Sequence, residues 1–163
     1  MYTKKTIYFT FLLLITSSQS SATSLATAGW IEKAIIFPAE ITLLAKLDTG
    51  AATSSINATT PEFFERNGIR WTRFHITNKD KETATIEAPV IRDATIKRHF
   101  GNKQTRPVIK IDICIGNVRK TEEVNLVDRS NLNYQLLIGR NFLKNNLLID
   151  SANTYRLSPD CSE

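Results

Sequence analysis

A succession of short extended segments, joined by tight turns and with no long helix between them, is the feature that most constrains the fold. The segments are rich in β-branched and aromatic residues, and the turns between the later ones carry Gly and Asn. The expected strands are 30–37, 41–48, 53–58, 69–77, 82–97, 104–115 and 118–127. This pattern predicts a mainly β domain, either an antiparallel sandwich or a small closed barrel.

Two short helices complete the expected secondary structure. Thr60 is a suitable N-cap, Pro61 suits the first helical turn, and Gly68 suits the end of a helix, so the sequence predicts a helix over 61–67. A second short helix is expected over 140–145. We therefore expect one domain of mostly β structure.

The segment Leu43 to Ile56 places a carboxylate at a tight turn between two of these strands. An apolar strand ends at Asp48, the chain turns at Thr49 and Gly50, and small and β-branched residues follow. Glycine allows the backbone to fold closely around the carboxylate. An Asp-Thr-Gly tripeptide is weak evidence alone, because a simple polar turn has the same sequence.

In a second segment, Tyr134 to Leu143, the expected short apolar strand Leu137-Ile138-Gly139 is followed by an amphipathic helical turn. With the Asp48 turn, it makes the chain resemble the retropepsin-like aspartic peptidases, which combine one Asp-Thr-Gly-Ala with a later Ile-Gly-Arg. The resemblance is stronger to a bacterial retropepsin-like family that carries the label "ATP-dependent zinc protease". The matching positions are Gly29 to Glu32, Ala45 to Ala51, Thr53 to Ala58, Arg106 to Val108, Asp128 to Ser130 and Leu137 to Arg140.

This resemblance implies a single-lobed acid-protease fold, which is a closed β-barrel, and assigns roles to individual residues. Asp48 would be the catalytic carboxyl, Thr49 would bond across two subunits, and Gly50 would shape the turn. The supporting residues would be Ala51, Thr53, Gly139 and Arg140. In viral retropepsins the arginine pairs with an acid four residues after the catalytic Asp, but that position here is Ala52.

The sequence contains one such carboxylate turn, and peptide hydrolysis by this chemistry needs two carboxyl groups. Metal-free peptide hydrolysis needs one carboxylate to take a proton from water and a second, protonated carboxyl to polarise the scissile carbonyl. A homodimer would supply both, because a two-fold axis brings Asp48 against its own copy. Two such groups at contact distance share one proton, because both cannot ionise at low cost. The resemblance thus implies an aspartic endopeptidase with a peptide or protein substrate.

A second class of function stays open, in which the chain keeps the fold as a peptide-binding or interaction module without turnover. Ala52 favours this alternative, and so does the lack of a glycine-rich hairpin to cover the substrate. The candidate for such a flap is the hairpin tip containing His99, Phe100 and Gly101. An ordinary surface hairpin would have the same sequence.

The sequence gives no support for zinc, ATP or nucleic acid. Its only histidines, His75 and His99, do not form a zinc-peptidase motif, and no phosphate-binding glycine loop precedes a Lys-Ser/Thr pair. Basic residues are scattered without interleaved aromatic residues, which argues against a nucleic-acid partner. We expect no cofactor and no metal site.

The N-terminus has the pattern of a secretory signal peptide, with Lys4 and Lys5 before about ten apolar residues and then a stretch of small residues. We expect a signal over residues 1–24, cleavage between 20 and 28, a peptidase domain over 29–158 and a tail over 159–163. The apolar run is too short to span a bilayer of about 30 Å, so no stable membrane anchor is expected. Export across the inner membrane would place the protein in the periplasm.

Cys114 and Cys161 are the only cysteines. In an exported protein they could pair and tie the tail to a strand. Alternatively, Cys114 is buried in its apolar strand and Cys161 is free, because the sequence does not give the distance between them.

Overall fold

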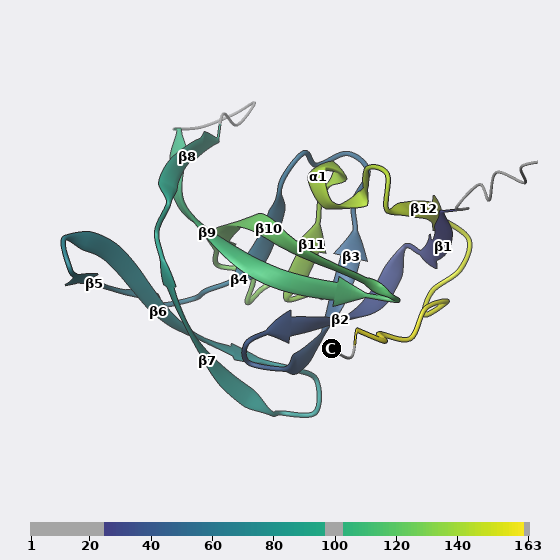
Figure 1. Ribbon diagram of the computed structural model, residues 1–163, viewed down its shortest axis with the longest axis horizontal. Coiled ribbons are helices and arrows are strands. Elements are labelled where there is room, and N and C mark those ends of the chain that lie inside the picture. Colours follow the sequence, from purple (N-terminus) through teal and green to yellow (C-terminus); the bar gives the residue numbers. More distant parts are fainter. Residues whose placement is uncertain (1–24, 97–102, 162–163) are drawn as a thin grey trace, which may run out of the picture.

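The computed structural model describes residues 25–96 and 103–161, which form a mainly β domain with one short helix (Figure 1). The strands are β1 (Ala26–Gly29), β2 (Ile31–Phe37), β3 (Ile41–Leu47), β4 (Ser54–Asn57), β5 (Glu62–Arg66), β6 (Ile69–Thr77), β7 (Thr83–Pro89), β8 (Arg92–Ile96), β9 (Gln104–Ile115), β10 (Val118–Val127), β11 (Leu136–Ile138) and β12 (Leu147–Asp150). The helix α1 spans Arg140–Leu143. No helix in the described part of the chain is long and apolar enough to cross a membrane.

Six strands close into a barrel. Their order is β10-β4-β11-β3-β2-β9, and β9 pairs again with β10 to complete the circle. Strand β8 pairs antiparallel with the first part of β9, from Gln104 to Val108. The expectation of a closed β-barrel is therefore confirmed, and the alternative of a sandwich is wrong.

The core lies inside this barrel and is built from alternate residues of each strand. Ala34 and Ile36 of β2, Leu43 and Ala45 of β3, and Ile113 of β9 belong to one buried cluster. Successive side chains of a strand point to opposite faces, so one face of each strand fills the interior. The other face of β3 is partly exposed and carries Thr42, Leu44 and Lys46.

A three-stranded sheet, β5-β6-β7, extends from the barrel and projects to the left in Figure 1. The predicted helix over 61–67 is wrong, because residues 62–66 form β5 and pair with β6. Asn67 and Gly68 both have positive φ, 55° and 73°, which is the geometry of a two-residue hairpin turn. The ring of Phe64 also stacks on Trp71 of β6 at 6.5 Å, which favours the strand.

The C-terminal segment packs along the barrel and is fixed at several points. The amide of Tyr155 donates to the carbonyl of Ile31 at 2.8 Å. The buried carboxylate of Glu32 accepts the amides of Gly29, Arg156 and Leu157 at 2.6, 2.9 and 3.2 Å.

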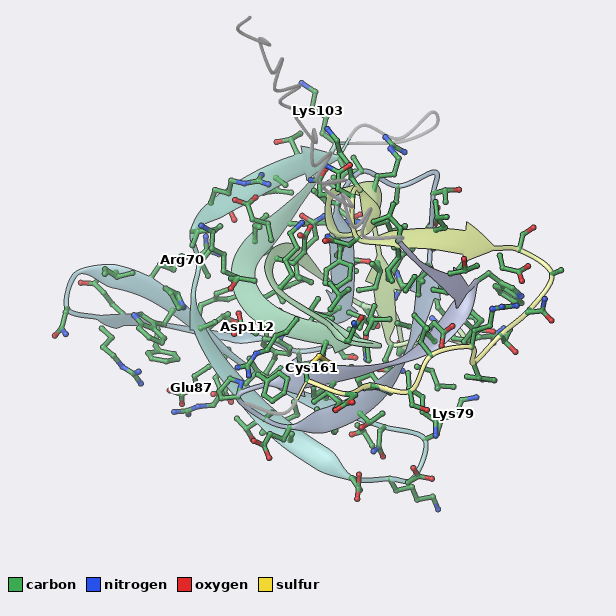
Figure 2. The ribbon with its side chains drawn as sticks, turned by 45° about the vertical axis from the view of Figure 1, so that its right-hand side comes forward. Arg70, Lys79, Glu87, Lys103, Asp112 and Cys161 are labelled. Atoms are coloured by element: carbon green, nitrogen blue, oxygen red, sulfur yellow. A yellow bond between two sulfur atoms is a disulfide. The ribbon has the colours of Figure 1, made fainter. Side chains whose placement is uncertain are left out.

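Cys114 and Cys161 form a disulfide with a Cα–Cα distance of 6.2 Å, so the paired alternative is confirmed. Cys114 is buried in β9, as expected, but Cys161 is not free. Figure 2 labels Cys161 where the tail reaches the barrel. The tail is thus attached to the domain as far as residue 161.

Candidate active site

Asp48 follows β3 directly, at the point where three strands meet. Strand β11 lies between β3 and β4, parallel to the first and antiparallel to the second. The amide of Asp48 donates to the carbonyl of Ile138 at 2.8 Å. Strand β11, which contains Leu137 and Ile138 of the expected Leu137-Ile138-Gly139 strand, therefore braces the Asp48 turn.

The Asp48 carboxylate is held through one oxygen. Oδ1 accepts the amides of Gly50 at 2.8 Å and Ala51 at 3.1 Å. Oδ2 accepts no hydrogen bond from the described residues. The turn thus fixes the direction of the carboxylate and leaves one oxygen available to a second molecule.

Arg140 holds the same turn through backbone carbonyls. Its Nη1 donates to the carbonyl oxygen of Thr49 at 2.9 Å and of Gly50 at 2.6 Å. Its amide also donates to the carbonyl of Ala51 at 2.9 Å. The missing acid at Ala52 therefore does not leave Arg140 without a bracing role; the guanidinium binds the loop itself.

Gly139 lies where the backbone that follows β11 touches the backbone that precedes β4. A Cβ at this position would be 2.6 Å from the carbonyl carbon of Thr53 and 2.7 Å from the carbonyl oxygen of Ala52. Its amide donates to Ser54 Oγ, which is buried, at 3.1 Å. Only glycine allows this close approach of the backbones.

Thr53 contacts a residue that no sequence motif indicated. The Thr53 hydroxyl accepts a hydrogen bond from Asn125 Nδ2 at 3.0 Å. Asn125 is buried on β10, and its Oδ1 has no partner among the described residues. Thr49, in contrast, is exposed, and its hydroxyl makes no hydrogen bond within the described part of the chain.

A buried arginine lies near the turn. Arg129 donates from Nε to the carbonyl of Tyr134 at 2.9 Å and from Nη1 to Ser55 Oγ at 3.1 Å. Burial and the nearby charge of Arg106 lower its pKa, whereas the charge of Asp48 raises it. The sequence pointed to this residue only through the matching run Asp128-Arg129-Ser130.

The candidate flap residues His99, Phe100 and Gly101 lie outside the described residues. The strands that lead to them are described, and β8 pairs with β9 in an antiparallel hairpin from Arg92–Val108 to Ile96–Gln104. The flap assignment therefore stays a prediction.

Across residues 25–96 and 103–161, no three His, Cys, Asp or Glu side chains group closely enough to hold a metal ion. His75 bonds to Thr85 Oγ1 at 2.9 Å through Nδ1. The other histidine, His99, lies outside the described residues.

Comparison with known proteins agrees with this geometry. Residues 27–158 match the family described as "Retropepsin-like aspartic endopeptidase RimB". The chain belongs to the RimB-like family. This description names an aspartic endopeptidase, and the zinc-protease label finds no support in it.

A solved structure from Legionella pneumophila, the protein Lpg0085 of unknown function, is similar to this RimB-like chain over its length. The two are 33% identical with a TM-score of 0.69, and the match covers 82% of this chain and 98% of the other. The fold is therefore one that this relative also adopts.

Curated relatives are similar over a segment only. One, from Desulfotalea psychrophila, is named "Probable alpha-L-glutamate ligase" and is 34% identical over 66% of this chain and 24% of its own length. Another of the same name, from Shewanella pealeana, is 33% identical over 69% of this chain and 25% of its own. The chain spans about a quarter of the length of these relatives.

Proposed function

We propose that the chain is an aspartic endopeptidase that works as a homodimer, with Asp48 from each subunit at its centre. The observation that carries the proposal is the state of the Asp48 carboxylate. Two amides hold Oδ1, and Oδ2 is left without a partner in the described chain, at a partly exposed turn. A buried structural carboxylate such as Glu32 instead uses both oxygens to bind backbone amides.

In this proposal the two aspartates share one proton across the two-fold axis. The ionised carboxylate takes a proton from a water molecule while the water oxygen attacks the scissile carbonyl carbon. The protonated carboxyl donates a hydrogen bond to the carbonyl oxygen. A proton then passes to the amide nitrogen as the carbon–nitrogen bond breaks. The chain's own role is to orient the carboxylates, through Gly50, Ala51 and Arg140.

An apolar surface beside the turn supports the proposed dimer. A pocket of about 520 Å³ is lined by Leu25, Thr49, Leu143 and Leu148, among others. Leu148 is 54% exposed. A second copy of the chain would cover this surface and bring the two Thr49 hydroxyls together, which is the proposed cross-subunit contact.

We also propose that the protein acts outside the cytoplasm, in the periplasm. The Cys114–Cys161 disulfide supports this, because structural disulfides form and persist in oxidising compartments. The signal-peptide pattern lies in residues 1–24, outside the described residues, and stays a prediction.

Glutamate-containing peptides are the first substrates to try. The reason is that relatives with a matching segment are named probable alpha-L-glutamate ligases. The proposal takes nothing else from those relatives, because this chain spans only about a quarter of their length.

The test compares the mature protein with its Asp48→Asn variant on a mixed peptide library from about pH 4 to 7. We expect the native protein to cleave peptides and the variant to lose at least about a thousand-fold in kcat, because the variant cannot take or give the proton. If the well-folded native dimer cleaves nothing but still binds peptides, the non-catalytic binding module replaces the peptidase.

A further inference from the structure

Strand β5 forms the outer edge of the three-stranded sheet β5-β6-β7. It pairs with β6 on one side, and no described residue pairs with it on the other. Four of its five residues are exposed. Figures 1 and 2 both show the hairpin of β5 and β6 extending away from the barrel. An open edge of this kind presents backbone N–H and C=O groups that can pair with another strand.

The hairpin turn determines which backbone groups of β5 face the open edge. Residues that close a two-residue turn exchange backbone hydrogen bonds with each other, and bonded pairs then alternate along the two strands. The turn between β5 and β6 is closed by Arg66 and Ile69. Alternate residues from Arg66 back along β5 therefore bond to β6, whereas Phe63 and Glu65 direct their N–H and C=O groups to the open edge.

The sequence of β5, Glu62-Phe63-Phe64-Glu65-Arg66, is complementary to itself when a second copy runs antiparallel. With Phe64 opposite its own copy, Phe63 lies opposite Glu65 of the second copy, and both have outward backbone groups to exchange. Glu62 lies opposite Arg66 of the second copy, so opposite charges face each other at both ends of the pair. This register uses the whole length of β5.

The neighbouring registers fit less well. With Glu65 opposite its own copy, two carboxylates face each other. With Phe63 opposite its own copy, Glu65 lies opposite Pro61, which has no N–H to donate. A shift by one residue sets outward groups against groups that already bond to β6. Pairing about Phe64 is therefore the favoured antiparallel arrangement.

Aromatic side chains add apolar surface at this edge. Phe63 is 43% exposed. Phe64 stacks on Trp71 of β6, and the guanidinium of Arg66 lies 5.2 Å from the centroid of the Phe64 ring. Opposite residues that exchange no backbone hydrogen bonds bring their side chains closest, and Phe64 would meet its own copy in such a pair. The two Phe64 rings would then extend the aromatic stack across both sheets.

We propose that β5 is a self-association surface, at which two copies of the chain pair their β5 strands antiparallel about Phe64 to form one continuous sheet. This surface differs from the proposed Asp48 dimer interface, which includes Leu148 of β12. Strands β5 and β12 lie toward opposite ends of the longest axis (Figure 1). The inference does not depend on the peptidase function. A chain that uses both two-fold interfaces assembles beyond a dimer.

Sedimentation velocity of the mature protein from about 1 to 500 μM tests the proposal. The wide range is needed because so short an edge buries less surface than a stable interface and associates weakly. We expect the mass of the assembly to rise at least about two-fold with concentration. Glu65→Pro removes an outward N–H and no bond to β6, so it should weaken association at least about ten-fold. The control Glu65→Gln keeps the N–H and should associate like the native protein.

An exchange of charges tests the register. Glu62→Lys and Arg66→Glu each place like charges opposite one another, so each variant alone should associate at least about five-fold more weakly. In an equimolar mixture the new lysine faces the new glutamate, and association should return. The control is Lys79→Glu at the exposed β6–β7 turn, which changes the net charge as Arg66→Glu does and should leave association unchanged.

Three results would overturn the proposal. The first is a native protein whose mass stays constant up to about 500 μM, which would leave the edge to some other partner. The second is association that Glu65→Pro does not weaken. The third is a mixture of Glu62→Lys and Arg66→Glu that fails to associate although both variants keep the tryptophan fluorescence of the native protein. Should Arg66→Glu unfold the hairpin, Glu65→Pro and its Gln control still decide.

Discussion

At the scale of single residues, the site depends on how closely two backbone segments can approach. Gly139 touches the carbonyls of Ala52 and Thr53, and Gly50 curves beneath the carboxylate, where a Cβ would lie 3.2 Å from Asp48 Oδ1. The first contact involves only backbone, which cannot move aside as a flexible side chain would. Gly139 is therefore the stricter position of the two.

We predict that Gly139→Ala lowers the free energy of unfolding by about 2–3 kcal/mol, because the added methyl forces β11 away from the Asp48 turn. Chemical denaturation measures this change. The control is Gly68→Ala in the hairpin turn, where φ is +73° and no atom lies within 4 Å of the added Cβ. It should cost about 1 kcal/mol, from backbone strain alone. Equal losses at the two glycines would contradict the close-contact account.

Residues close together in sequence were the easiest to predict. Asp48, Gly50 and Ala51 form one local turn, so their hydrogen bonds follow from adjacent positions. Arg129 and Asn125 reach the site from seventy or more positions away, at Ser55 and Thr53, and only the fold brings them there. The sequence indicated Arg140 as a supporting residue but not its partners. Those partners are backbone carbonyls, which every residue has.

At the scale of elements, alternation of residue types predicted the long strands well. The expected bounds of 69–77, 104–115 and 118–127 are those of β6, β9 and β10. The expected strand 82–97 is two strands, β7 and β8, that belong to different sheets. Periodicity shows where a chain is extended, but it does not show which partner each half pairs with.

The incorrect prediction of a helix over 61–67 shows that strand pairing can override residues that favour the ends of a helix. Pro61 and Gly68 suit a helix, yet Asn67-Gly68 also suits a two-residue hairpin turn. The hairpin is favoured because Phe64 gains the Trp71 ring, and Arg66 lies 4.4 Å from the centroid of that ring. These contacts need β6 and are not visible within residues 60–68. Figure 2 labels Arg70 and Glu87 on the resulting sheet.

The C-terminal tail is attached to the barrel by a disulfide, and its contribution to stability can be predicted. The Cys114–Cys161 bond closes a loop with a sequence separation of 47 residues. We predict that Cys161→Ser lowers the free energy of unfolding by about 2–4 kcal/mol, because the unfolded chain regains the freedom of that loop. Denaturation with and without reductant measures this. The native protein should lose a similar amount on reduction, and the variant should lose nothing further.

If reductant and substitution both leave stability unchanged, the disulfide does not hold the tail. Attachment would then rest on Glu32, whose carboxylate accepts the amides of Arg156 and Leu157.

At the scale of the whole molecule, the barrel is complete but the proposed active site is not. Six strands close on themselves and enclose one core. The Asp48 turn, in contrast, leaves one carboxylate oxygen and the Thr49 hydroxyl without a partner in the described chain, beside a surface that includes Leu148. A folded subunit therefore supplies half of the chemistry that peptide hydrolysis needs. We propose that an identical subunit supplies the second half.

The most direct test mixes native and Asp48→Asn subunits in equal amounts, lets them exchange, and measures peptide cleavage per total protein. A shared dyad predicts that only native homodimers cleave, so activity falls to about a quarter of that of the native protein. Subunits that work alone would give about a half. Activity near one half, with exchange verified by the mass of the mixed dimer, would contradict the account.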